Sequence, residues 1–199
     1  MNSPPEIAKL CLTYGINKLE KPFIKAFVLS IVGGLFIGAS SVLYNICSYN
    51  YSGGIAQFYS GLVFPIGSMA VYCAGAELFI GNILLTLAWI NRKICLLNML
   101  LNWLITLVGN FIGSLLIAIL VVYGHIPNMF NVHLEQIVIT FGIEKVSFSF
   151  AEAFIKGLLC IFLNCLAIWV SIGGREFRSV ILGLWIPIIL YQACNLDIL

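Results

Sequence analysis

Charged residues are scarce in this chain: they make up 9% of its 199 residues, against 61% that are hydrophobic. A soluble domain carries about 25% charged residues and could not hide so much apolar surface from water. A disordered chain is excluded for the opposite reason, because disorder needs low hydrophobicity and many charges. The mean hydropathy of +1.06 therefore indicates that lipid is the solvent, and residues 1–199 suit one integral-membrane domain.

Catalytic, metal-binding and nucleic-acid-binding patterns are also missing from the sequence. There is no G-x-S-x-G, no H-E-x-x-H and no phosphate-cradling glycine loop. None of the seven cysteines forms a C-x-x-C pair, and neither His125 nor His133 lies in a metal-like spacing with them. The net charge of +2 includes no clustered basic face of the kind that nucleic acid requires. We therefore expect no enzyme, no metal or other cofactor, and no nucleic-acid partner.

What the chain does have is a series of long apolar runs separated by short polar turns. A membrane span needs roughly 20 apolar residues, so the runs predict an all-α membrane protein. Ahead of them, residues 4–21 place apolar side chains on one face at helical spacing, which predicts an amphipathic helix in the membrane interface. The predicted membrane segments are 23–44, 55–90, 97–123, 150–172 and 179–195, and residues 124–149 form the longest predicted loop.

The second apolar run is too long for one span, and polar residues interrupt it. Glu77 and Asn82 lie inside it, close to Gly75 and Gly81. A broken helix at that depth persists only where protein or a water-filled cavity satisfies its backbone. We therefore predict a break over 75–82 that these four residues support. Glu77 is a functional site by default, but it can also accept hydrogen bonds from backbone N–H groups freed by the break, and we favour this structural role.

Basic residues alternate between the turns of the chain, which predicts its orientation. They lie before and at the start of the first span and in the turns near 92 and 175, whereas residues 48–54 and 124–149 contain few of them. Positively charged loops stay on the cytoplasmic side of a membrane. We expect a cytoplasmic N-terminus in a plasma or inner membrane.

Two segments echo each other along the chain. An F-P-I motif at 64–66 precedes Glu77, and an I-P-I motif at 186–188 precedes Asn195 and Asp197. The two segments would enter the membrane from opposite faces, so they predict an inverted repeat with paired broken helices, as in transporters and channels. By that symmetry, roughly 50–60 residues would be missing after Asp197.

Six motifs, in order and with suitable spacing, resemble those of the formate/nitrite transporter family. They are S-P-P-E-I-A at 3–8, F-P-I-G at 64–67, G-A-E-L-F-I-G-N at 75–82, N-W at 102–103 with G-N-F-I-G at 109–113, C-L-A-I-W at 165–169, and L-G-L-W-I-P-I at 182–188. The resemblance implies a homopentamer whose subunits each have an aquaporin-like outline, six spans and a pore of their own. About five of those six spans are present here.

The resemblance also implies what is transported and where. Family substrates are small monovalent anions of weak acids: formate, nitrite, acetate, lactate and hydrosulfide. Lys145 matches the family's vestibule lysine, which draws the anion in, although by itself it could be a solvated loop cation. Leu78 and Phe79 match the apolar residues of the first break, and Phe64 matches a constriction aromatic. Proton uptake would let the anion cross the apolar constrictions as a neutral acid.

Several positions depart from the family pattern. Ile80 replaces a threonine in the first break, Ile161 replaces an asparagine of the fourth span, and Ile198 stands where the second break has a histidine. Ser68 stands at a constriction hydrophobe and Asn164 lies one turn after Ile161, so both could line a pore or hydrogen-bond between helices. These departures and the early end of the chain motivate an alternative, a non-conducting truncated paralogue or fragment that acts at most as an accessory subunit.

Overall fold

The structure is a computed structural model that describes residues 2–50, 53–126 and 134–193. Its helices are α1 (Pro4–Leu19), α2 (Phe23–Asn50), α3 (Gly53–Val63), α4 (Pro65–Ala74), α5 (Phe79–Asn82), α6 (Leu85–Ile90), α7 (Leu96–Tyr123), α8 (Leu134–Ser147), α9 (Phe150–Gly173) and α10 (Phe177–Ala193). Four described stretches are long and apolar enough to cross a membrane: Phe23–Ser48, Gly54–Ala74, Leu96–Tyr123 and Phe150–Gly173. The chain is therefore a helical membrane bundle.

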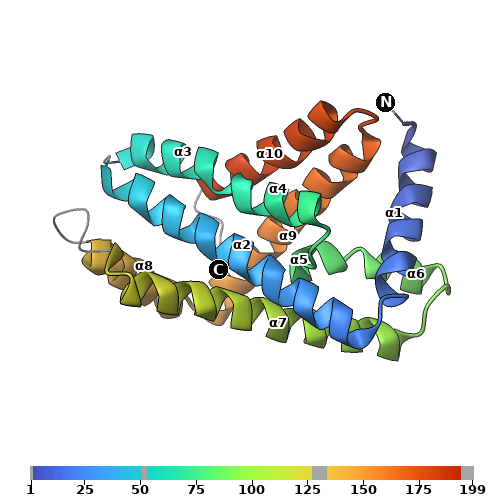
Figure 1. Ribbon diagram of the computed structural model, residues 1–199. Helices are drawn as coiled ribbons and strands as arrows, with labels where there is room; N and C mark the ends of the chain where they lie inside the picture. The colour runs from blue at the N-terminus through green and yellow to red at the C-terminus, as the bar shows by residue number, and fades with distance from the viewer. Residues whose placement is uncertain (1, 51–52, 127–133, 194–199) are drawn as a thin grey trace.

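Helix α1 lies across the end of the bundle where α2 begins (Figure 1). It begins at a capping box, because the Glu6 carboxylate accepts hydrogen bonds from the Ser3 backbone N–H (2.7 Å) and hydroxyl (2.9 Å). These bonds hold the pKa of Glu6 below its ordinary value. Asn2 fixes the start of the helix to the turn after α9, where its N–H donates to Gly173 O at 2.9 Å.

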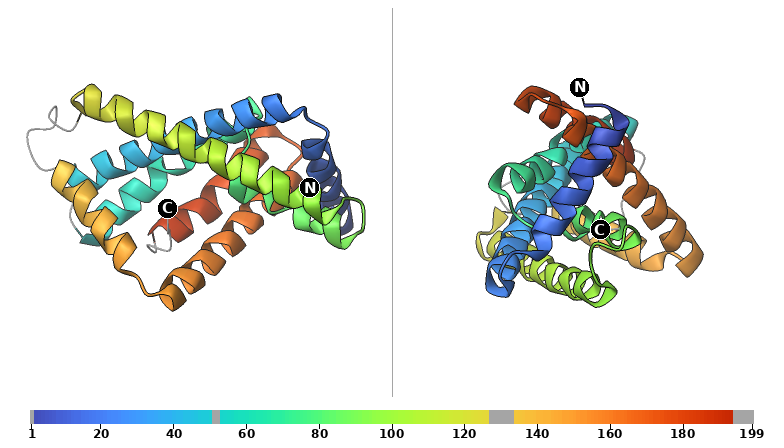
Figure 2. Two further views of the ribbon diagram at one scale, coloured as in Figure 1. Left: turned by 90° about the horizontal axis from the view of Figure 1, so that it is seen from below. Right: turned by 90° about the vertical axis from the view of Figure 1, so that its right-hand side faces the viewer.

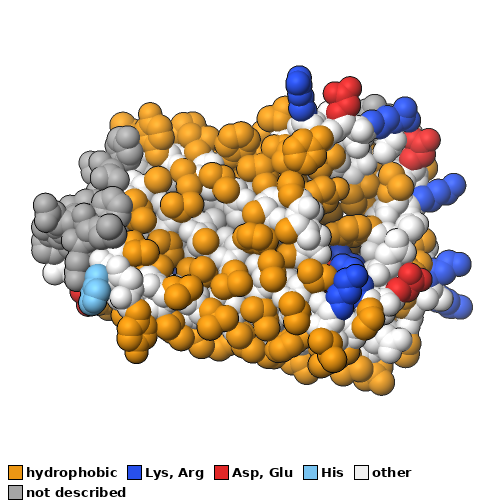
Figure 3. Space-filling view, in the orientation of Figure 1, with side chains coloured by type: hydrophobic (Ala, Val, Ile, Leu, Met, Phe, Trp, Pro, Cys, Tyr) orange, Lys and Arg blue, Asp and Glu red, His pale blue; other side chains and the backbone are white. Residues whose placement is uncertain are grey.

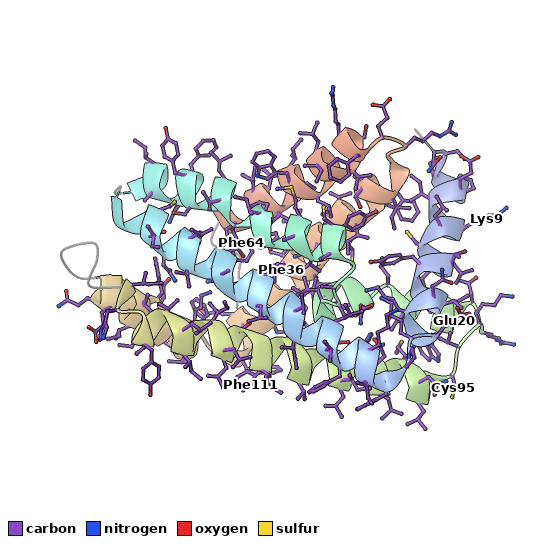
Figure 4. The ribbon with its side chains drawn as sticks, in the orientation of Figure 1. Lys9, Glu20, Phe36, Phe64, Cys95 and Phe111 are labelled. Carbon is purple, nitrogen blue, oxygen red and sulfur yellow. The ribbon has the colours of Figure 1, made fainter. Side chains whose placement is uncertain are left out.

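Close packing of α2 on α7 forms the most extensive helix pair of the bundle. Glycines on both helices let the backbones meet: a Cβ at Gly34 would lie 2.1 Å from Asn110 O, and one at Gly113 would lie 2.1 Å from Ile31 O. Small residues serve this purpose in membrane helices, which gain little from apolar side chains alone. The opposite side of α7 is exposed, as Phe111 illustrates at 68% exposure (Figure 4).

The core lies between α3, α4, α9 and α10. Phe64, at the junction of α3 and α4, packs edge-on against Tyr44 and Tyr191 with ring centroids 6.3 and 6.5 Å away. Trp185 anchors α10 to this junction, since its indole N–H donates to Leu62 O at 3.0 Å. The proline junction thus has a packed partner on α10, the helix that carries the I-P-I motif.

Two segments differ from the sequence-based expectation. Helix α2 continues to Asn50, beyond the predicted end of the first span at residue 44. The predicted loop over 124–149 contains α8, which meets α9 at a bend (Figure 2). We predicted a solvated loop here because the segment carries the charged residues Glu135, Glu144 and Lys145. Its other residues include leucine, isoleucine and glutamine, which are compatible with a helix, as glutamate is. Asn195, Asp197 and Ile198 lie outside the described residues.

Candidate functional site

The break in the second membrane segment begins at a glycine. Helix α4 ends at Ala74, and Gly75 adopts a left-handed conformation with φ of 65°. Its N–H donates to Tyr72 O at 3.3 Å, and that of Ala76 donates to Val71 O at 3.0 Å. A glycine takes this conformation at no steric cost and stops the helix. The chain then runs extended to Leu78 before the short helix α5 starts at Phe79.

An asparagine on α7 satisfies the backbone groups that the break leaves without helical partners. The Asn110 amide group donates to Glu77 O (2.9 Å) and Ser30 O (2.7 Å), and its oxygen accepts from Phe79 N–H (2.8 Å). Glu77 N–H donates to Leu29 O of α2 at 3.1 Å. Irregular backbone therefore exists at this depth because protein, rather than lipid, surrounds it.

The Glu77 carboxylate has a different role from the one predicted. Its side chain is 1% exposed and forms salt bridges with Lys18 of α1, at 2.6 Å, and with Lys21. Among the described residues, this carboxylate accepts hydrogen bonds from these two lysines and not from backbone N–H groups. Glu77 therefore joins the break to α1, which corrects the favoured interpretation of a backbone acceptor.

Lys18 was missed as a site residue although its sequence position carried a signal. Positions 7, 11, 14 and 18 share one helical face, so Lys18 lies on the apolar face of α1. The structure buries Lys18 to 5% exposure, and this burial lowers its pKa, an effect that Glu77 opposes. A buried ammonium group needs such a partner.

The same lysine continues into a buried amide network. Lys18 donates to the Asn82 side-chain oxygen at 2.5 Å, and the Asn82 amide group donates to Asn102 (2.8 Å) and Thr106 (3.0 Å) of α7. The Trp103 indole N–H donates to Asn82 O at 2.9 Å. Asn82 thus supports the end of the break, and Gly75 supports its start.

A cavity lies beside the break, between α4, α5, α9 and α10, with α1 at one end. Its volume is about 60 Å³, and part of it is open to the outside. The lining residues are Tyr14, Lys18, Ser68, Val71, Tyr72, Ala76, Leu78, Ile80, Gly81, Asn164, Ala167, Ile168, Leu184 and Ile188. Most are apolar, and the polar ones gather on α1 and Tyr72 or stand alone at Ser68 and Asn164.

The predicted pathway residues divide between this cavity and other places. Ser68, Leu78, Ile80 and Asn164 line the cavity, and so does Gly81, which was predicted as break support. Four others lie elsewhere. Phe64 is in the core, Phe79 packs against Trp103 with centroids 6.2 Å apart, Ile161 is 38% exposed on α9, and Lys145 is half-buried on α8.

Charged side chains gather at the end of the molecule where α1 lies (Figure 3). Lys9 on α1, Arg92 and Lys93 before α7, and Arg175 before α10 are all exposed. Lys18, which lines the cavity at this end, and Lys21 both pair with the single carboxylate of Glu77, so one positive charge is in excess in this cluster. An excess of one sign near a low-dielectric wall raises the local concentration of the opposite ion.

Comparison with known proteins gives a consistent result for sequence and fold. The uncharacterized transporter YrhG of Bacillus subtilis (strain 168) is 32% identical over 196 residues, which cover 96% of this chain and 73% of that protein. The formate channel BtFdhC of Bacillus thuringiensis is 30% identical over 194 residues, covering 96% and 74%.

Solved structures agree with these relatives. A structure of an FNT family ion channel matches with a TM-score of 0.88 and 25% identity, over 96% of this chain and 77% of that one. A pentameric formate channel with formate bound shares the fold, with a TM-score of 0.76 and 23% identity over 88% and 70%. The family model described as "Formate/nitrite transporter" matches residues 5–197. The chain is therefore a multi-pass membrane protein and no enzyme, and it belongs to the formate/nitrite transporter family.

Proposed function

We propose that this chain is a channel-like transporter of small monovalent weak-acid anions, with formate the first candidate and nitrite, acetate, lactate and hydrosulfide as others. The observation that carries the proposal is the mostly apolar cavity beside the break, with Lys18 in its lining and the Lys18–Lys21–Glu77 cluster, which has one positive charge in excess, beside it. A relative with 30% identity is named a formate channel, which supports formate as the first test substrate.

The apolar walls favour transport of a neutral species. A bare anion in such a cavity loses its water and gains few hydrogen bonds, which costs several kcal/mol. Proton uptake at the mouth removes that cost, so the anion and a proton cross together. Lys145, on α8 far from α1 (Figure 1), would attract the anion at the other end of the molecule.

The assembly and orientation follow from the same setting. We propose a homopentamer, as in the similar pentameric channel, with the exposed leucine face of α7 toward lipid or a neighbouring subunit. The exposed basic residues near α1 favour a cytoplasmic N-terminus in a plasma or inner membrane.

Formate flux into liposomes tests this proposal. The purified chain should carry formate and acetate faster at about pH 5.5 than at about pH 7.5, because more of the acid is protonated there. Lys145→Ala should lower the flux several-fold, whereas Lys93→Ala, an exposed lysine in the turn before α7, should not. Folded, inserted protein without flux would contradict the proposal and favour the alternative, a non-conducting accessory subunit.

A further inference from the structure

We propose that Asn164 and Ser68 form a hydrogen-bonding station that accepts the protonated, neutral form of a small weak acid and rejects its anion. The inference rests on the proposed function and adds a selective site to it. The station lies inside the cavity, whose other lining residues are mostly apolar, with Tyr14, Lys18 and Tyr72 as the polar ones.

The orientation of the Asn164 amide is set by its own helix. Its NH₂ group donates to the backbone oxygen of Cys160 at 2.9 Å and lies 3.5 Å from the Cys160 sulfur. A backbone carbonyl can only accept, so the nitrogen must lie toward α9 and the amide oxygen away from that bond. Asn164 is 7% exposed and lines the cavity.

The amide oxygen of Asn164 is available to a ligand. This oxygen accepts no hydrogen bond from the described residues. It is also not fully enclosed by protein, so part of it stays accessible. We place this edge on the cavity side because Asn164 lines the cavity. A nearly buried acceptor without a donor is costly, and a ligand that brings a donor removes the cost.

Ser68 supplies the complementary group from another wall. It lies on α4, is half-buried, lines the same cavity, and makes no hydrogen bond with any residue that the structure describes. Its hydroxyl can donate as well as accept. The two side chains therefore offer one obligatory acceptor and one adaptable donor within otherwise apolar surroundings.

A protonated carboxylic acid matches this pair. Its O–H donates to the Asn164 oxygen, and its carbonyl oxygen accepts from the Ser68 hydroxyl. The carboxylate has no donor, so it would face the amide oxygen with negative charge and leave that oxygen unpaired. The ligand class is thus a small neutral molecule with a hydrogen-bond donor and an adjacent acceptor.

Permanently neutral probes separate this inference from transport of the acid. Formamide carries N–H donors and an acceptor, whereas methyl formate carries acceptors only. Liposomes containing the protein should be more permeable to formamide than empty ones, and formamide should inhibit formate flux at low formate concentration. Methyl formate should do neither through the protein.

Two variants locate the effect. Asn164→Val and Ser68→Ala should each reduce the protein-dependent formamide permeability and the formate flux about fivefold, the fold-change of one hydrogen bond. Asn91→Val removes the same type of amide bond, to Leu87 O at 2.8 Å on an exposed turn, and Ser41→Ala removes a hydroxyl bond on α2. Both control variants should behave as the unmodified chain.

The outcomes are distinct. Folded Asn164→Val and Ser68→Ala proteins that pass formamide and formate at the unmodified rates would overturn the station while the proposed function stands. Formamide permeability that depends on Asn164, without any formate flux, would support the station and contradict the proposed function. If Asn164→Val fails to fold, Ser68→Ala, which removes a single oxygen atom, decides the question.

Discussion

Helices α7 and α9 are both long apolar membrane helices with an asparagine inside the bundle, half-buried Asn110 on α7 and buried Asn164 on α9, yet the two amides serve different purposes. On α7, Asn110 uses both ends of its amide, since it donates to two backbone oxygens and accepts from one N–H. On α9, Asn164 uses only its nitrogen, for a bond within its own helix. The α7 amide holds the break in place, whereas the α9 amide leaves an acceptor for the cavity.

This contrast gives a physical criterion for assigning polar residues in a membrane interior. A buried amide whose groups are all paired with backbone contributes to stability, because its removal leaves those backbone groups unsatisfied. A buried amide with one unpaired end contributes little to stability and is free to bind a solute. Stability and transport should therefore respond to different asparagines.

The largest effect on stability should come from the cluster of Lys18, Lys21 and Glu77, which Asn82 links to Asn102 of α7. Glu77→Gln leaves Lys18 buried without a carboxylate, which should lower the free energy of unfolding by about 3–5 kcal/mol. Thermal unfolding in detergent, followed by tryptophan fluorescence, measures this loss. Glu176→Gln, at an exposed carboxylate, should leave the transition in place, and an equally stable Glu77→Gln protein would contradict the role of the cluster.

Removal of the α7 amide should have the next largest effect. Asn110→Leu leaves Ser30 O, Glu77 O and Phe79 N–H without these partners, so we expect a loss of about 2–4 kcal/mol. Asn98→Leu is the matched control, because Asn98 is an exposed asparagine on the same helix. Equal unfolding temperatures for the two variants would remove the distinction between paired and unpaired amides.

Asn164→Val tests the α9 asparagine in the same comparison of stability. Cys160 O keeps its place in the helix without the side-chain bond, so stability should change by no more than about 1 kcal/mol. The unfolding transition is measured in the same detergent as for the Asn110 variant. A loss as large as that of Asn110→Leu would show that the α9 amide is structural.

The smallest effect concerns the start of α1. The Ser3 bonds lower the pKa of Glu6, so they stabilise the protein above the ordinary glutamate pKa and are lost as the pH falls through the lowered value. Glu6→Gln should therefore narrow the difference in unfolding temperature between about pH 7 and about pH 3. Glu20→Gln, at an exposed carboxylate just after α1, should keep the full difference.

The sequence predicted the break well because local signals mark it. Gly75, Glu77 and Asn82 are unusual in an apolar run, and their polarity places them in protein surroundings. The membrane helices were predicted from the length of the apolar runs, and the first helix from apolar residues at helical spacing. Family membership followed from six spaced motifs, and the family model confirms it.

What the sequence could not supply is the set of long-range partners. The Lys18–Glu77 pair joins positions 59 residues apart, and no local sequence pattern predicts it. The sequence also could not predict the direction of each side chain. Leu78 and Phe79 are neighbours, but Leu78 lines the cavity and Phe79 faces α7. Asn195 and Asp197, the predicted second break, lie outside the described residues and stay a prediction.

The most direct test of the cavity as the transport path uses Gly81. This glycine lines the cavity, and a Cβ there would meet only Ile168 Cδ1, at 4.0 Å, so Gly81→Leu should fill the cavity without disturbing the backbone. Formate flux at about pH 5.5 should fall at least tenfold, whereas Gly142→Leu, on α8 with nothing within 4 Å of its Cβ, should leave it unchanged. Unaltered flux through the folded Gly81→Leu protein would contradict the account, because the solute would then pass elsewhere.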